Sequence, residues 1–142
     1  MKTKRLIVRV VPFFALIFSA ISITSVSQAA PAVNPIASTV VASLTTLPAD
    51  GKSFTKVTIN AVANNSKPAN ITSASLLANP STGVLYAVAF SSNPPPPTPG
   101  QVVFEVSSTV AEQVTFTAVI NGVTLLEQPV VTFTAPSTGL VN

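Results

Sequence analysis

Residues 113–123 read Gln-Val-Thr-Phe-Thr-Ala-Val-Ile-Asn-Gly-Val, and this stretch decides the fold class. Apolar residues alternate with threonine from Val114 to Thr117, and Ala118 and Ile120 continue the same face. Period two is the pattern of a strand with one face in a core. The following Asn-Gly pair tolerates the positive φ of a tight hairpin turn. The stretch therefore predicts a β-hairpin.

The returning strand is expected over residues 123–134, with Val123 and Leu125 before Pro129 and a Val-Val-Thr-Phe-Thr run after it. A proline cannot donate to a β-ladder. Pro129 therefore indicates either an edge position or a break between two short pieces.

Outward from this hairpin, alternation recurs in short runs separated by clusters of Pro, Gly, Asn and Ser. Residues 71–77 leave their orientation open, and residues 84–90 are apolar on both faces, which is typical of a central strand or one covered by a loop. Tyr86 and its neighbours form either core or an exposed binding patch. The expected strands are 39–43, 53–63, 71–77, 84–90, 101–107, 113–120 and 123–134.

This spacing predicts an all-β chain, an immunoglobulin-like β-sandwich of about seven or eight short antiparallel strands. The chain has no cysteine, so no disulfide ties the sheets. Aliphatic packing and six aromatic residues are expected to hold the core: Phe54, Tyr86, Phe90, Phe104, Phe116 and Phe133.

The first 29 residues have the three-part pattern of a secretory signal peptide. Four basic residues precede an apolar stretch over 10–23, and a run of small and polar residues follows. Small side chains at Ser27 and Ala29 indicate cleavage after Ala29, and a cut after Ala30 is less favourable because Pro31 would follow it. The alternative is an uncleaved anchor, but the apolar core of about 14 residues is shorter than the roughly 20 that a span needs. We expect an extended leader over 30–37, the domain over 38–134 and a tail over 135–142.

Removal of residues 1–29 changes the charge of the chain. The whole sequence carries +3, but the remainder has three lysines against four carboxylates and a net charge of −1. The basic character therefore belongs to the targeting segment, and we expect no nucleic-acid partner and no membrane attachment after cleavage.

Common catalytic chemistry lacks its residues in this chain. There is no His and no Cys, and the carboxylates Asp50, Glu105, Glu112 and Glu127 are scattered. Serine–lysine catalysis remains formally open, although the three lysines fall on a turn, a wet face and a loop. A calcium site at Asp50 would need several more oxygen ligands, and a turn role explains this residue. We expect no catalytic, cofactor or metal site, and therefore no enzyme.

Two segments are candidates for contact with a partner. Pro94, Pro95, Pro96 and Pro97 form a polyproline stretch that either presents a preordered ligand to an aromatic groove or is a stiff loop. Val130 and Val131 lie on a strand that would accept a partner strand if its edge were open.

Six segments resemble the bacterial immunoglobulin-like domain of the invasin and intimin type (group 1). Residues 38–43, 47–53 with the turn Pro-Ala-Asp-Gly, and 55–59 resemble the family's opening strands, and residues 100–109, 114–123 and 131–133 its later ones. The middle, around residues 65–69, departs from the family pattern. Such domains usually serve as tandem spacers in surface adhesins, so the resemblance implies the sandwich fold but not adhesion itself.

We therefore expect an exported, non-enzymatic immunoglobulin-like module that binds or spaces at the cell surface, in the periplasm or in the medium. Its partner would be a protein or a surface. The alternative is a subunit of a surface or fimbria-like assembly that docks by strand addition. A secreted enzyme or inhibitor ranks last.

Overall fold

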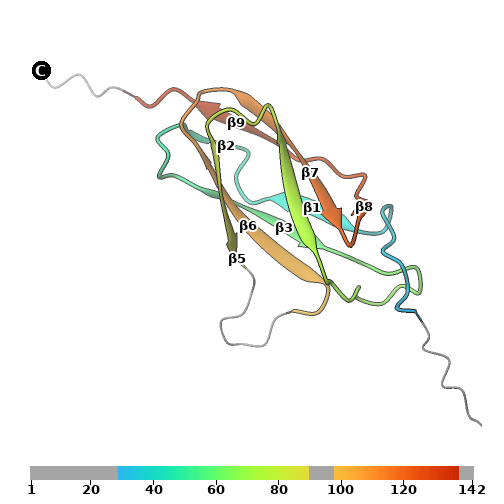
Figure 1. The fold of residues 1–142 in the computed structure, drawn as a ribbon. Helices are drawn as coiled ribbons and strands as arrows, with labels where there is room; N and C mark the ends of the chain where they lie inside the picture. The colour runs from blue at the N-terminus through green and yellow to red at the C-terminus, as the bar shows by residue number, and fades with distance from the viewer. Residues whose placement is uncertain (1–28, 90–97, 138–142) are drawn as a thin grey trace, which may run out of the picture.

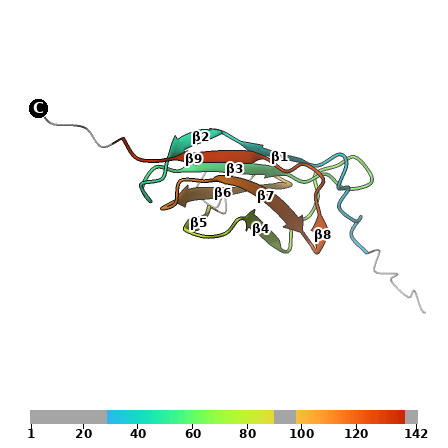
Figure 2. The same ribbon diagram turned by 90° about the horizontal axis from the view of Figure 1, so that it is seen from above.

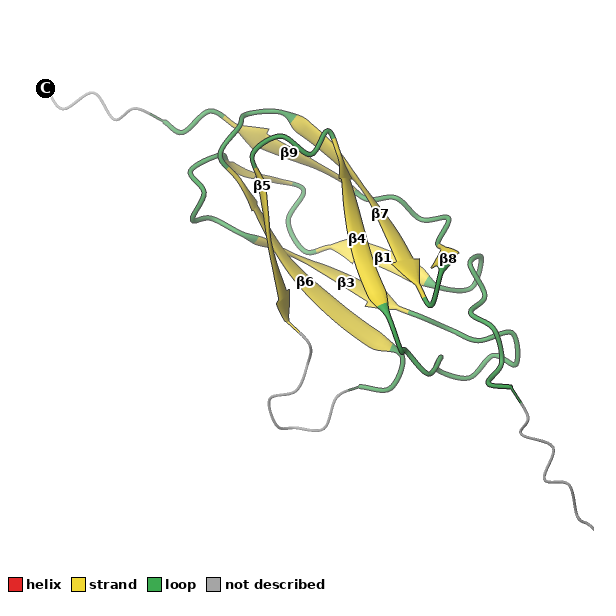
Figure 3. Ribbon diagram, viewed as in Figure 1, coloured by secondary structure: helices red, strands yellow, loops and turns green. Residues whose placement is uncertain are grey.

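The structure, a computed structural model of the 142-residue chain, describes residues 29–89 and 98–137. This part contains strands and loops only (Figure 3). The strands are β1 Thr39–Ala42, β2 Thr46–Pro48, β3 Thr55–Asn60, β4 Ala74–Asn79, β5 Val84–Ala89, β6 Gln101–Ser108, β7 Gln113–Ile120, β8 Val123–Thr124 and β9 Val130–Thr134.

The strands form two sheets, with the orders β1-β3-β6-β5 and β2-β9-β7-β4, and β8 also pairs with β7. In chain order this is the arrangement of a constant-type immunoglobulin domain, in which strands one, two, five and four share one sheet. The first strand is split into β1 and β2, which lie in different sheets, and the last into β8 and β9. The predicted sandwich is confirmed, except that β2 runs parallel to β9.

The core lies between the sheets, where each long strand turns every second residue inward. On β6 and β7 the buried positions alternate without a break. The largest fully buried side chains are Phe116, Phe133, Ile59, Ile120 and Leu125. Burial of each such side chain contributes roughly 1.5–3 kcal/mol, so this alternation supplies the main stabilisation of a chain without disulfides.

The predicted hairpin is present: β7 has the expected bounds, and Asn121 and Gly122 have φ of 51° and 79°. Pro129 lies in the break between β8 and β9, as one of its two interpretations required. Asn121 also accepts hydrogen bonds at Oδ1 from the backbone N–H groups of Thr72 (2.8 Å) and Ser73 (3.0 Å). The turn therefore holds the chain that leads into β4, which begins three residues later than predicted.

Two of the expected core aromatics are not in the core. Phe54 and Tyr86 are 49% and 43% exposed, whereas Phe104, Phe116 and Phe133 are buried; Phe90 lies outside the described residues. The expectation that 84–90 is central or covered is also wrong among the described residues, because β5 is an edge strand. Leu85 faces outward and is 51% exposed, whereas Val84 packs against the core.

The segment expected to be a leader contributes to the domain. Val33 is buried and forms an isolated bridge with Ala63. Asn34 accepts hydrogen bonds at Oδ1 from the N–H groups of Ile36 and Ala37, which closes a turn before β1. The predicted signal peptide lies almost wholly outside the described residues, which begin at the exposed Ala29 and Ala30.

The domain is elongated, and its strands run roughly along its length (Figure 1). The blue beginning and the red end of the described chain lie at opposite ends, and the view from above agrees (Figure 2). No helix in the described residues has the length and hydrophobicity to cross a membrane.

Candidate binding groove beside strand β5

A groove lies on the outer face of the four-stranded sheet, at the β5 margin. The inward residues of β6 are buried, so its alternate residues, including Glu105 and Ser107, face outward. Leu85 pairs with Ser107 on one side, and Phe54 lies beside it on the other because the next residue, Thr55, pairs with Val106. A small serine between two large apolar side chains leaves a hollow.

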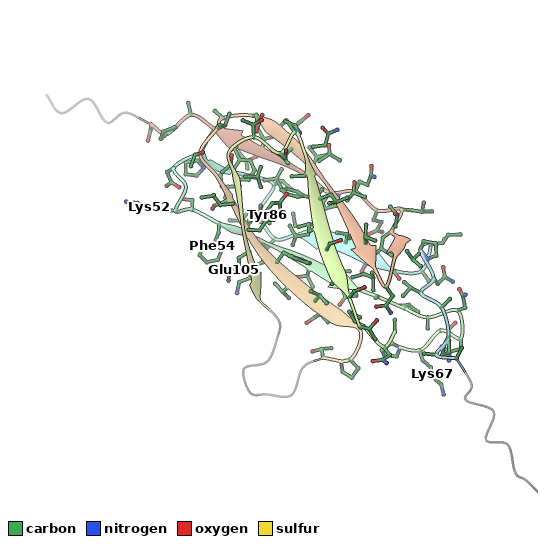
Figure 4. The ribbon with its side chains drawn as sticks, viewed as in Figure 1. Lys52, Phe54, Lys67, Tyr86 and Glu105 are labelled. Atoms are coloured by element: carbon green, nitrogen blue, oxygen red, sulfur yellow. The ribbon has the colours of Figure 1, made fainter. Side chains whose placement is uncertain are left out.

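This hollow has a volume of about 190 Å³. Phe54 and Leu85, which are 49% and 51% exposed, line it with apolar side chains. Pockets for drug-sized ligands have about 300 Å³ or more, so the groove suits one amino-acid side chain better than a metabolite. Its lining residues are Lys52, Phe54, Leu85, Tyr86, Glu105 and Ser107, several of which are labelled in Figure 4.

Charged groups surround the groove. Lys56 Nζ lies 3.9 Å from Glu105 Oε1, and both side chains reach solvent. An exposed ion pair of this length contributes little, typically below about 1 kcal/mol. Lys52 forms no ion pair within the described part of the chain. Two ammonium groups thus accompany one carboxylate around the groove.

The turn before β3 holds the rim of the groove. Asp50 Oδ1 accepts hydrogen bonds from the N–H groups of Lys52 (2.8 Å) and Ser53 (2.6 Å), and Gly51 N–H donates to the Ser108 carbonyl (2.9 Å). The backbone bonds from Ser53 and then Lys52 lower the pKa of Asp50. The turn is thereby fastened to β6, which places Lys52 and Phe54 beside the hollow.

Tyr86 lies between the margins of the two sheets. It pairs with Val106, whose side chain is fully buried, and therefore points toward the interior from the edge strand. Partial burial raises the pKa of its phenol, and a hydrogen bond with the backbone of Ala78 on β4 opposes that rise. The neutral phenol thus links β5 to the edge of the opposite sheet.

The residues predicted for partner contact have different outcomes. Val131 is fully buried on the inward face of β9, and β2 pairs with Thr132–Thr134, directly after the two valines. Val130 alone remains partly exposed. Residues 94–97 lie outside the described residues. The exposed patch around Tyr86, left open by the sequence, is present, but Phe54 was missed as part of it.

Three of the four carboxylates of the described chain serve separate local contacts. Asp50 holds its turn, Glu105 lies near Lys56, and Glu127 Oε2 accepts from the Val40 N–H at 2.8 Å. Glu112 Oε1 is buried without a hydrogen-bond partner. Within residues 29–89 and 98–137, no three carboxylates gather into a group that could hold a metal ion.

Neither the family models nor the curated proteins searched give a match. Several solved structures match the chain. Invasin, a bacterial integrin-binding protein, matches 75% of this chain and 20% of its own at 18% identity and a TM-score of 0.61. The fold is that of an adhesin immunoglobulin-like domain.

Two further adhesins share this adhesin-type fold. For the Yersinia pseudotuberculosis adhesin InvE the match covers 71% of this chain and 27% of InvE, at 16% identity and a TM-score of 0.56. For the Escherichia coli adhesin FdeC the values are 73% and 33%, at 18% identity and 0.50. The resemblance to the invasin and intimin type is thus confirmed for the fold. This chain spans a third or less of each adhesin.

Proposed function

We propose that this protein is an exported, non-enzymatic immunoglobulin-like module that works at the cell surface by binding a protein or by spacing other parts. The observation that carries the proposal is the position of the chain ends. The described chain enters at one end of an elongated sandwich and leaves at the other (Figure 1). That geometry keeps both ends of the described chain away from the long sides of the sandwich, which suits contact along those sides.

The distribution of functional groups supports a binding role over catalysis. The sequence lacks His and Cys, and three of the four described carboxylates make separate local contacts. Catalysis of acyl or phosphoryl transfer needs a nucleophile, a base and an orienting group within hydrogen-bond reach of one another. The groove beside β5 instead offers apolar walls with a charged rim, which is the composition of a contact surface.

Export rests on the first 29 residues, whose basic, apolar and small-residue regions follow one another in the order of a signal peptide. Cleavage after Ala29 would release a weakly acidic domain. Surface placement is the finer part of the proposal, and the adhesin-type fold supports it.

The test is expression of the full chain in a bacterial host, followed by fractionation and mass spectrometry of the intact protein. We expect a product that begins at Ala30, outside the inner membrane. Protease added to whole cells should remove it if it lies at the surface and spare it if it lies in the periplasm. Full-length protein retained in the inner membrane would contradict export, and turnover in a broad hydrolase screen would contradict the non-enzymatic assignment.

A further inference from the structure

Within residues 29–89 and 98–137, β6 is the one strand that pairs with β5, so the other side of β5 has no strand beside it. Thr109 N–H donates to the Gly83 carbonyl, so residues 83 and 109 form a hydrogen-bonded pair of the β5–β6 ladder. Hydrogen-bonded and non-bonded pairs alternate in an antiparallel ladder. Residues 85, 87 and 89 therefore bond to β6, and the N–H and C=O groups of Tyr86 and Val88 point away from the sheet.

Two of the other three sheet edges are capped or short. On β1, the outward N–H of Val40 donates to the Glu127 carboxylate at 2.8 Å. β4 has six residues without charge or proline, as β5 has, but no residue of β4 lines the hollow. β2 has three residues and ends in Pro48. Side-chain capping, short length and proline are recognised ways of blocking an edge.

β5 carries none of these protections. Its sequence Val-Leu-Tyr-Ala-Val-Ala has six residues and includes no charge and no proline. An uncharged, apolar edge is a template for pairing with another chain. The groove also begins at this edge, because Leu85 is both an edge residue and a wall of the hollow.

We propose that β5 accepts an extended segment of a partner protein as an added strand. One apolar side chain of that segment fills the hollow between Phe54 and Leu85, and an acidic side chain two residues away meets the lysines at its rim. The inference rests on the proposed binding function and names its surface and the chemistry of its partner.

Size and charge select this occupant. Six residues span about 20 Å, and the hollow of about 190 Å³ holds one side chain. A stable contact between two folded domains needs roughly 1,200 Å² or more, which a single strand edge and one small hollow do not offer. Lys56 lies next to Glu105, so the ammonium group of Lys52, which lines the hollow, is left to meet a carboxylate of the added segment.

The test uses ¹⁵N-labelled protein from expression of the full chain and a synthetic peptide, acetyl-Thr-Thr-Glu-Thr-Phe-Thr-Thr-amide. Glu and Phe lie two residues apart and share one face of a strand. We expect amide shifts at Tyr86, Val88 and Ser107, with slower hydrogen exchange at the first two. Replacement of the peptide Glu by Lys should weaken binding about two- to fivefold, and added salt should reduce that difference.

Paired variants locate the site. Leu85→Ala should weaken binding at least about fivefold, because it removes a wall of the hollow. Leu77→Ala is the matched control, since Leu77 is a similarly exposed leucine (56%) on the edge strand of the other sheet, and binding should not change. Val88→Pro removes an outward N–H without breaking the β5–β6 ladder. It should abolish the protection of the Tyr86 amide against hydrogen exchange. If this variant fails to fold, the two leucine variants still decide.

Other occupants overturn the inference. Shifts at β4 but not β5, or equal losses in Leu85→Ala and Leu77→Ala, would place the site elsewhere. A dimer in sedimentation experiments that Leu85→Lys dissociates would make a second copy the occupant. If the peptide does not bind although the protein is exported and surface-accessible, this inference fails and the proposed function stands.

Discussion

Asn121 should be the most informative single position for testing the fold. It adopts φ of 51° in the β7–β8 turn and binds the chain before β4 on both sides of its amide. Oδ1 accepts from Thr72 N–H (2.8 Å), Thr72 Oγ1–H (3.0 Å) and Ser73 N–H (3.0 Å), and Nδ2 donates to the Asn70 carbonyl (2.7 Å). Truncation thus removes four hydrogen bonds and leaves a residue with Cβ in the left-handed region.

The expected cost can be divided between these two causes. The bonds are exposed, so each contributes near the lower limit of the usual net value, about 0.5 kcal/mol, or roughly 2 kcal/mol together. Alanine in the left-handed region costs about 1 kcal/mol more. Asn121→Ala should therefore lower the free energy of unfolding by about 3 kcal/mol, Asn121→Gly by about 2 and Asn121→Asp, which keeps the acceptor, by about 1.

Equilibrium unfolding in urea, fitted with a common slope, measures these differences. Asn65→Ala is the control, because Asn65 Oδ1 accepts only a local bond from Lys67 N–H at 3.2 Å. It should cost less than about 0.5 kcal/mol. The reasoning is refuted if Asn121→Ala unfolds at the same urea concentration as the Asn65→Ala control, or if Asn121→Gly is the least stable of the series.

Three further predictions use the same unfolding assay. Gly100→Ala should lower the free energy of unfolding by about 2–4 kcal/mol and Gly122→Ala by about 1. A Cβ at Gly100 (φ 75°) would lie 2.6 Å from the Ala61 carbonyl oxygen, whereas a Cβ at Gly122 (φ 79°) meets nothing within 4 Å. Equal costs for the two variants would exclude the clash. Thr55→Val should lower the free energy of unfolding by about 1–3 kcal/mol. Thr55 is fully buried, and its Oγ1 accepts from Leu44 N–H and donates to the Leu44 carbonyl, both at 2.9 Å. An unchanged urea midpoint would mean that these groups find other partners. The pKa of Asp50 is lowered, so its contribution to stability is complete above the ordinary value of 3.8 and is lost as pH falls through the folded value. The difference in free energy of unfolding between wild type and Asp50→Asn should therefore shrink below about pH 4. A difference that stays constant with pH would argue against this reasoning.

The sequence predicts those elements whose signal is local. β6 and β7 have one buried face and obey period two over eight residues each, so their position and orientation follow from alternation alone. The hairpin turn follows from an Asn-Gly pair. β2, in contrast, has three residues and pairs in parallel with β9, more than 80 positions later. No local pattern encodes such a pairing, and its Leu-Pro pair indicates a turn instead.

The candidate site could be predicted only in part, because edge positions depend on strand order. An apolar run over 84–90 is compatible with a central strand as well as with an edge strand. The strand order decides between them, because among the described strands β5 pairs with β6 and no other. On β9, Val131 is buried because it lies on the inward face, and β2 covers this edge only from Thr132 to Thr134, a pairing that the sequence did not reveal.

Phe54 shows where residue type and alternation conflict. Counting back by twos from the buried Ile59 and Val57 places Thr55 inside and Phe54 outside, and the structure obeys that count. Alternation prevails because reversing it would shift every side chain of β3 to the other face. The hydrogen bonds to Leu44 offset the cost of burying the Thr55 hydroxyl. The phenyl ring is half-exposed and forms a wall of the hollow beside β5, an edge strand without charge or proline.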